Sequence, residues 1–89
     1  MHAVLLTVRI EGDLDGAVKS LQEQVVPMVR SQPGFVAGYW FEARDGKAYS
    51  VVLFQTEEQA RAAAPPVGSK PSPFATVETT DIRGVAANA

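Results

Sequence analysis

Hydrophobic positions gather in the stretch from Pro33 to Phe54. Within it, residues 35–41 and 48–54 are rich in aromatic and β-branched side chains, which is typical of β-strands. Asp45-Gly46 lies between the two runs, and this pair is favoured in hairpin turns because glycine adopts a positive φ without steric cost. The pattern therefore predicts a β-hairpin.

Both faces of this predicted hairpin are apolar. Successive strand side chains point to opposite faces, so Phe35 and Tyr39 fall on one face and Trp40 on the other. Tyr49 and Phe54 are separated in the same way in the second strand. An antiparallel sheet commonly leaves one polar face to solvent. Two apolar faces predict that both sides of the sheet are covered.

A strand and a helix are predicted before the hairpin. Apolar residues alternate over 3–10, and between Leu14 and Gln32 their spacing changes to three and four, which predicts a helix. Asp13 or Asp15 is available to cap its first turn. Pro27 lies inside this helix, where it removes a backbone hydrogen bond and clashes with the preceding turn. We therefore expect a kink or a break there.

A short helix and a last strand are predicted after the hairpin. Thr56 with the two glutamates that follow it is typical of a helix start. The alanine-rich helix over 57–64 ends at Pro65-Pro66, and 67–73 has the composition of an exposed loop. The alternation of Thr and Val over 74–85 predicts the last strand.

The resulting order, β-α-β-β-α-β, predicts an α+β, ferredoxin-like fold with a four-stranded antiparallel sheet. Both helices would lie on one face of this sheet. The other face is apolar, and packing against the same face of a second copy would cover it, as in the twofold homodimers that are the commonest oligomers. Eighty-nine residues without a repeat or a linker predict a single domain, 1–89.

The composition narrows the function classes. The chain has no cysteine, so disulfides, thiolate metal sites and thiol nucleophiles are excluded. The net charge is −2 with scattered basic residues, which gives no electrostatic footprint for nucleic acid. The apolar N-terminal stretch is too short for a membrane span and has no cationic region before it. We therefore expect a cytoplasmic protein.

Two segments and the hairpin between them resemble the antibiotic biosynthesis monooxygenase (ABM)-type domains of the dimeric α/β-barrel superfamily. The segments are VVPMVRSQPGFVAGYW and VVLFQTEEQARAAA, and the resemblance covers about residues 3–64. It implies a homodimer in which two sheets form a barrel and each subunit holds a pocket between sheet and helices. Some such proteins oxidise polycyclic phenols with dioxygen and without metal or flavin, and others degrade haem.

The chain departs from the active members, which use Asn, Trp, His, Tyr and Arg around the pocket. Its only asparagine is Asn88 and its only histidine is His2, so the second helix lacks the iron-ligating histidine of haem-degrading relatives. The resemblance thus implies no cofactor and no metal. We expect a cofactor-independent monooxygenase for a small aromatic phenol or quinol. The alternative is a non-catalytic dimeric module that binds a small ligand.

Hairpin aromatics are the candidate ligand-binding residues: Trp40, Phe54, Tyr39 and Tyr49. Such residues are more often core or dimer-interface residues, because aromatic side chains dominate burial at both. Tyr39 and Tyr49 are also candidate catalytic residues, since a phenol hydroxyl can donate a proton or a hydrogen bond. The alternative is that these hydroxyls simply reach the sheet edge.

Arg9 is the third candidate catalytic residue, as a charge within the first strand. It would orient an anionic substrate, or it would pair with an acid of the last strand, Asp81 or Glu78. Structural pairing is the more common role for such a residue.

Overall fold

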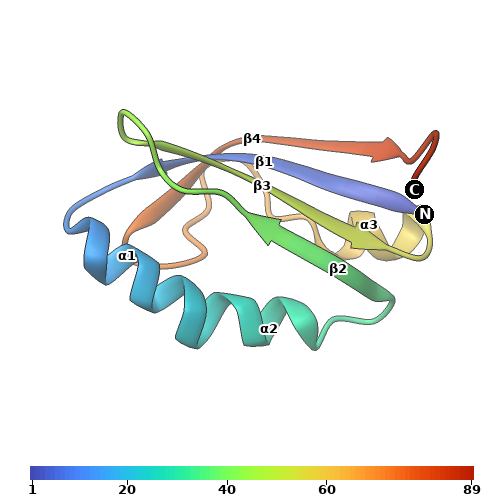
Figure 1. The fold of residues 1–89 in the computed structure, drawn as a ribbon, viewed down its shortest axis with the longest axis horizontal. Coiled ribbons are helices and arrows are strands. Elements are labelled where there is room, and N and C mark those ends of the chain that lie inside the picture. Colours follow the sequence, from blue (N-terminus) through green and yellow to red (C-terminus); the bar gives the residue numbers. More distant parts are fainter.

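Four antiparallel strands form one sheet, and all helices lie on one of its faces (Figure 1). The computed structural model describes residues 1–89. Its elements are β1 (His2–Ile10), α1 (Leu14–Ser20), the π-helical η1 (Leu21–Val25), α2 (Val26–Arg30), β2 (Phe35–Trp40), β3 (Lys47–Phe54), α3 (Glu57–Ala63) and β4 (Ala75–Gly84). The strand order β2-β3-β1-β4 confirms the predicted α+β, ferredoxin-like fold. None of the helices has the length and apolar character needed to span a membrane.

The hairpin between β2 and β3 forms at the predicted turn. Asp45 and Gly46 have φ values of 55° and 76°, and two positive values in succession define the primed turn that matches strand twist. Arg44 and Lys47 exchange two backbone hydrogen bonds, of 2.8 and 3.1 Å, across this turn. The sequence signal and the structure therefore agree here.

A β-bulge at Val36 changes the face to which the first residue of β2 points, so the predicted assignment of faces is wrong at this position. Phe35 opposes Phe54, whereas Ala37 opposes Leu53, so the register shifts between the two pairs. The bulge inserts one extra residue and moves Phe35 to the helix-covered face, away from the face predicted by simple alternation. The Phe35 and Phe54 rings meet edge to face with centroids 6.4 Å apart.

The first helix passes Pro27 without a break. α1, η1 and α2 follow one another directly, and Figure 1 shows them as one continuous helix. The π-helical turn of η1 ends just before Pro27, and the N–H of Val26 donates to the carbonyl of Leu21, five residues back. Such a wide turn gives a proline ring space inside a helix. The structure thus has a π-helical turn where the sequence predicted a kink or a break.

Both helix starts are capped as predicted. The carboxylate of Asp13 accepts hydrogen bonds from the backbone N–H groups of Asp15 and Gly16. Thr56 and Gln59 form a capping box, in which each side chain accepts from the backbone N–H of the other residue. These caps satisfy N–H groups that have no partner within the helix.

The hydrophobic core is small and lies under α3. Its buried members are Val4, Val52, Phe54 and Ala60. Ala60 is fully buried, because an alanine on α3 lets this helix approach the sheet closely. α3 lies near both chain ends, whereas α1 lies at the opposite end of the sheet (Figure 1). The two ends of the sheet are covered differently, and this difference creates the site described below.

Gly34 provides a test of how β2 is joined to α3. Its φ is 79°, and a Cβ at this position would collide with the Gln59 side chain of the capping box. Gly46 has nearly the same φ with open space around it. The positive φ should cost each Gly→Ala variant about 1–2 kcal/mol, and loss of the cap should cost Gly34→Ala about 1 kcal/mol more. Equilibrium unfolding in urea measures the free energy of unfolding of both variants relative to the wild type. Equal losses would contradict the contact with Gln59.

Candidate ligand-binding cavity

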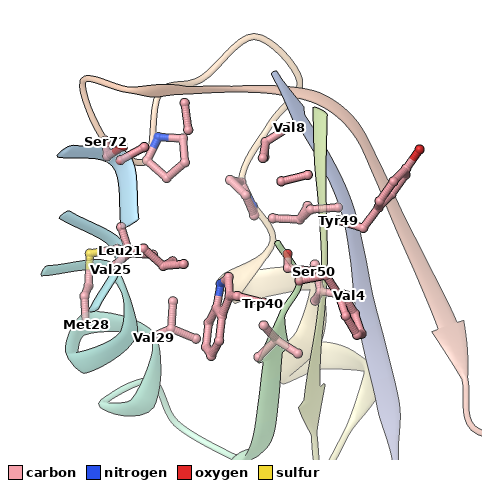
Figure 2. Close-up of a pocket in the computed structure, with 18 of the residues that line it drawn as sticks. Val4, Val8, Leu21, Val25, Met28, Val29, Trp40, Tyr49, Ser50 and Ser72 are labelled. Atoms are coloured by element: carbon pink, nitrogen blue, oxygen red, sulfur yellow. The ribbon is translucent and has the colours of Figure 1, made fainter. Parts of the chain in front are cut away.

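A cavity of about 640 Å³ lies between the first helix and the sheet (Figure 2). Its origin is a mismatch of side-chain size. The strand residues that face the helix here include three small ones, Ala48, Ser50 and Ala75, and all three are buried. Small side chains cannot fill the distance to a helix that carries leucine, valine and methionine. The hollow is therefore a property of the sequence.

The apolar helix face predicted from the sequence forms one wall of the cavity. Figure 2 shows Leu21, Val25, Met28 and Val29 on this wall, facing Val4 and Val8 of β1 across the hollow. The residues that define the predicted face are Leu14, Val18, Leu21, Val25 and Met28, and only Val25 is buried. The others remain accessible from the cavity or its mouth, where a tightly packed helix would have buried them.

The segment between α3 and β4 closes a further side of the cavity. Pro65, Pro66 and Pro71 line it, and Ser72 lies at the end of the cavity away from Trp40 (Figure 2). The predicted loop is largely exposed, with Val67 65% exposed, and it is joined to β4 by two backbone hydrogen bonds. Val77 accepts from the Gly68 N–H at 2.8 Å and donates to the Ser69 carbonyl at 2.9 Å.

Trp40 projects into the cavity from the end of β2. Its ring lies between the helix wall and the strands in Figure 2. Gly38, two residues earlier on the same face, leaves room for this ring, because a Cβ there would come within 2.6 Å of it. Phe54 also lines the cavity but belongs to the core and is 1% exposed.

Tyr39 and Tyr49 lie on the opposite face of the sheet. Tyr39 opposes Val51 and Tyr49 opposes Thr7, and their side chains are 59% and 57% exposed. Tyr49 borders the cavity through its position on β3, but Figure 2 shows its ring pointing away. The structure therefore does not bring the two tyrosines together with Trp40 around one ligand.

Arg9 pairs with a residue that the sequence reasoning did not name. Its guanidinium contacts the Glu11 carboxylate at 2.8 Å. Pairing with Asp81 or Glu78 was the wrong expectation, because those acids lie nearest to cations of β4 and β3. Glu11 follows two residues after Arg9, so an extended backbone places both side chains on the same side.

Glu11 also accepts a hydrogen bond from Lys70 Nζ at 2.7 Å. Because Lys70 lies in the segment between α3 and β4, this bond joins that segment to the end of β1. Hydrogen bonds from Lys70 and then from Arg9 lower the pKa of Glu11 from 4.5 to about 2. Lys70 is the only cationic residue that borders the cavity. Its charge is balanced by Glu11 at the rim. Glu42, the only bordering carboxylate, is largely exposed and lies 3.7 Å from Arg44.

The fold and the cavity define an α+β, ferredoxin-like protein with a hollow of ligand size between helix and sheet. Its structure is similar to that of a variant of SnoaB, a cofactor-independent oxygenase from Streptomyces nogalater. The TM-score is 0.65, and the match covers 98% of this chain and 95% of that chain at 13% identity. This likeness is one of fold. A scan against models of known protein families and a search of curated proteins both find no match.

The resemblance implied a pocket between sheet and helices, but the sequence did not show which side chains would form this cavity. A signal for it exists in the pairing of two patterns. The helix repeats large apolar residues, whereas the second hairpin strand and the start of the last strand place Ala48, Ser50 and Ala75 on the facing side. Neither pattern indicates a hollow alone. Their combination does so only after the strand register is known.

Lys70→Met should raise the pKa of Glu11 from about 2 toward 4.5, because it removes the largest stabilising contact of the carboxylate. Arg9→Met should raise the pKa less. NMR titration of the Glu11 carboxyl carbon measures this pKa in the wild type and in both variants.

The pKa of Glu11 in the folded state lies below its ordinary value, so ionised Glu11 stabilises the fold above pH 4.5. This stabilisation is lost as the pH falls from 4.5 toward 2. If the pKa of Glu11 is the same in Lys70→Met as in the wild type, the Glu11–Lys70 contact does not hold the segment between α3 and β4.

Proposed function

We propose that the cavity binds a small aromatic phenol or quinol and that the protein oxygenates this ligand without a cofactor. The observation that carries the proposal is the cavity, whose volume of about 640 Å³ falls in the range of small-molecule sites, ~300–1,000 Å³. Its lining is mostly hydrophobic, with 21 of 31 residues, which suits a ring system. The similarity in fold to SnoaB, a cofactor-independent oxygenase, supports this choice of reaction.

In such a reaction the ligand itself supplies the electrons. The substrate loses a proton, and its anion reduces dioxygen. One oxygen atom becomes a carbonyl oxygen of the product and the other leaves as water. The protein contributes a site from which bulk water is excluded, hydrogen-bond donors, and a group or water path that takes the proton.

A second candidate function is a non-catalytic module that binds a small ligand. It is favoured by the positions of Tyr39, Tyr49 and Arg9, the candidate catalytic residues. The tyrosine rings lie on the face away from the cavity, and the Arg9 guanidinium is engaged by Glu11. No histidine, and no carboxylate other than exposed Glu42, borders the cavity to act as a base.

We also propose that the protein is a homodimer joined through the outer face of the sheet. Here the outer face means the side away from the helices, with Tyr39, Tyr49, Leu5, Val51 and Leu53. The tyrosines are more than half exposed, and no element of the chain covers this face. Apolar surface of this kind is commonly an interaction site. A cytoplasmic location stays a prediction from the sequence.

Dioxygen uptake separates the two candidate functions. With a panel of dihydroxynaphthalenes and dihydroxyanthracenes, the oxygenase predicts uptake above the protein-free rate. Ala48→Leu should lower this uptake at least about tenfold, because the added atoms fill the cavity where the substrate would react.

If Tyr39→Phe and Tyr49→Phe keep the dioxygen uptake of the wild type, neither tyrosine takes part in the reaction. Loss of uptake in either variant would show that this tyrosine does take part. Ligand binding across the panel without uptake would support the non-catalytic module.

The dimer is tested by light scattering over a dilution series. The wild-type protein should keep the mass of a dimer at low micromolar concentration, and Tyr49→Asp should shift it to the monomer, because the variant buries an unpaired charge at the interface. Val67→Asp is the matched control, since Val67 is an exposed apolar residue outside the outer face. A monomeric wild type would contradict the proposed interface, as would equal dissociation of both variants.

A further inference from the structure

Two polar groups on adjacent strands face the cavity, whose lining is mostly hydrophobic. Trp40 on β2 and Ser50 on β3 are directly opposed in the register and share the helix-covered face. Side chains of such a pair have Cβ atoms about 4.5–5.5 Å apart. Figure 2 shows both side chains at the cavity, with the indole nitrogen of Trp40 on the open side of its ring.

Neither group has a hydrogen-bond partner within the chain. The other serines around the cavity are engaged, since Ser69 Oγ donates to the Pro66 carbonyl and Ser72 Oγ accepts from the Phe74 N–H. Ser50 is only 7% exposed, yet its hydroxyl makes no such bond. The Ser50 hydroxyl and the Trp40 N–H are therefore both free to donate to a molecule in the cavity, which both residues line.

We propose that Trp40 Nε1–H and Ser50 Oγ–H together bind one carbonyl oxygen of a flat aromatic ligand. This inference rests on the proposed ligand-binding function and names the group that the site recognises. The indole nitrogen can only donate, and a carbonyl oxygen has two lone pairs, so one oxygen can accept from both residues. The rest of the ring system would lie along the apolar helix wall.

The charges around the cavity point to a neutral ligand. Lys70 is the only bordering cation, and its ammonium group contacts Glu11 at 2.7 Å. A carboxylate or sulfonate inside the cavity would lose its hydration without gaining an opposite charge. The class that fits is therefore an aromatic ketone or a quinone, including the carbonyl-bearing product of the proposed oxygenation.

Fluorenone and fluorene test this assignment, because they have the same three-ring outline and differ in a carbonyl against a methylene group. We expect the wild-type protein to bind fluorenone about three- to tenfold more tightly than fluorene, the effect of one or two net hydrogen bonds. Fluorene-9-carboxylate, an anion of similar outline, should bind more weakly than either. Equilibrium dialysis measures the three dissociation constants without depending on tryptophan fluorescence.

Ser50→Ala and Trp40→Phe each remove one donor and keep most of the side-chain volume or the aromatic ring. Each should reduce the ratio by which fluorenone is bound more tightly than fluorene, because only fluorenone loses a hydrogen bond. The carbonyl stretching frequency of bound fluorenone should rise in both variants, a change that loss of packing alone would not produce. Ser31→Ala, a serine outside the cavity, is the control and should match the wild type.

Three results separate this inference from the proposed function. A preference for fluorenone that both variants reduce supports the assigned pair. Equal binding of fluorenone and fluorene, or equal weakening of both by Ser50→Ala, would overturn the pair and leave the cavity as a ligand site. Binding of neither probe would overturn both the pair and the proposed small-ligand function.

Discussion

The distance between helix and sheet is the constraint on which this structure depends, and side-chain size sets it. Under α3, the alanine at position 60 allows direct contact with Phe54, and the chain forms a compact core. Under α1 and η1, large side chains project from the helix and small ones from the strands, so contact across the layer is incomplete. Protein interiors are normally packed as densely as organic crystals. A hollow on one half of a sheet is therefore a feature that the sequence encodes against the general tendency.

Local chemistry made most of the fold predictable. The Asp45-Gly46 turn, the Asp13 and Thr56 caps and the change of hydrophobic period each depend on neighbouring residues, and the structure confirms them. The bulge at Val36 and the π-helical turn before Pro27 were not predicted. Both are one-residue insertions into a regular element. Such insertions leave little trace in the periodicity of a single chain.

The candidate site could be only partly predicted from the sequence, for a related reason. Alternation correctly separated Trp40 from Tyr39 within one strand, but it could not tell which of the two faces the helices would cover. That choice depends on the bulges and on the connections around the sheet. Once Trp40 faces the helix, both tyrosines must face outward, and the aromatic cluster suggested by the hairpin becomes two separate surfaces. One surface borders a cavity, and the other is the proposed dimer interface.

Charge is excluded from the interior of the cavity and concentrated at its rim. The rim holds the Arg9–Glu11–Lys70 network, where a carboxylate with a pKa of about 2 stays ionised at neutral pH and holds the segment over the cavity. The interior offers the Trp40 and Ser50 donors within a mostly hydrophobic lining. Exposed ion pairs contribute little to affinity, whereas a neutral donor in an apolar site discriminates against ligands that lack an acceptor. For the proposed ligand, selectivity would therefore depend on the outline of the ring system and on the position of its oxygen atom, whereas the charged rim joins the segment between α3 and β4 to the end of β1.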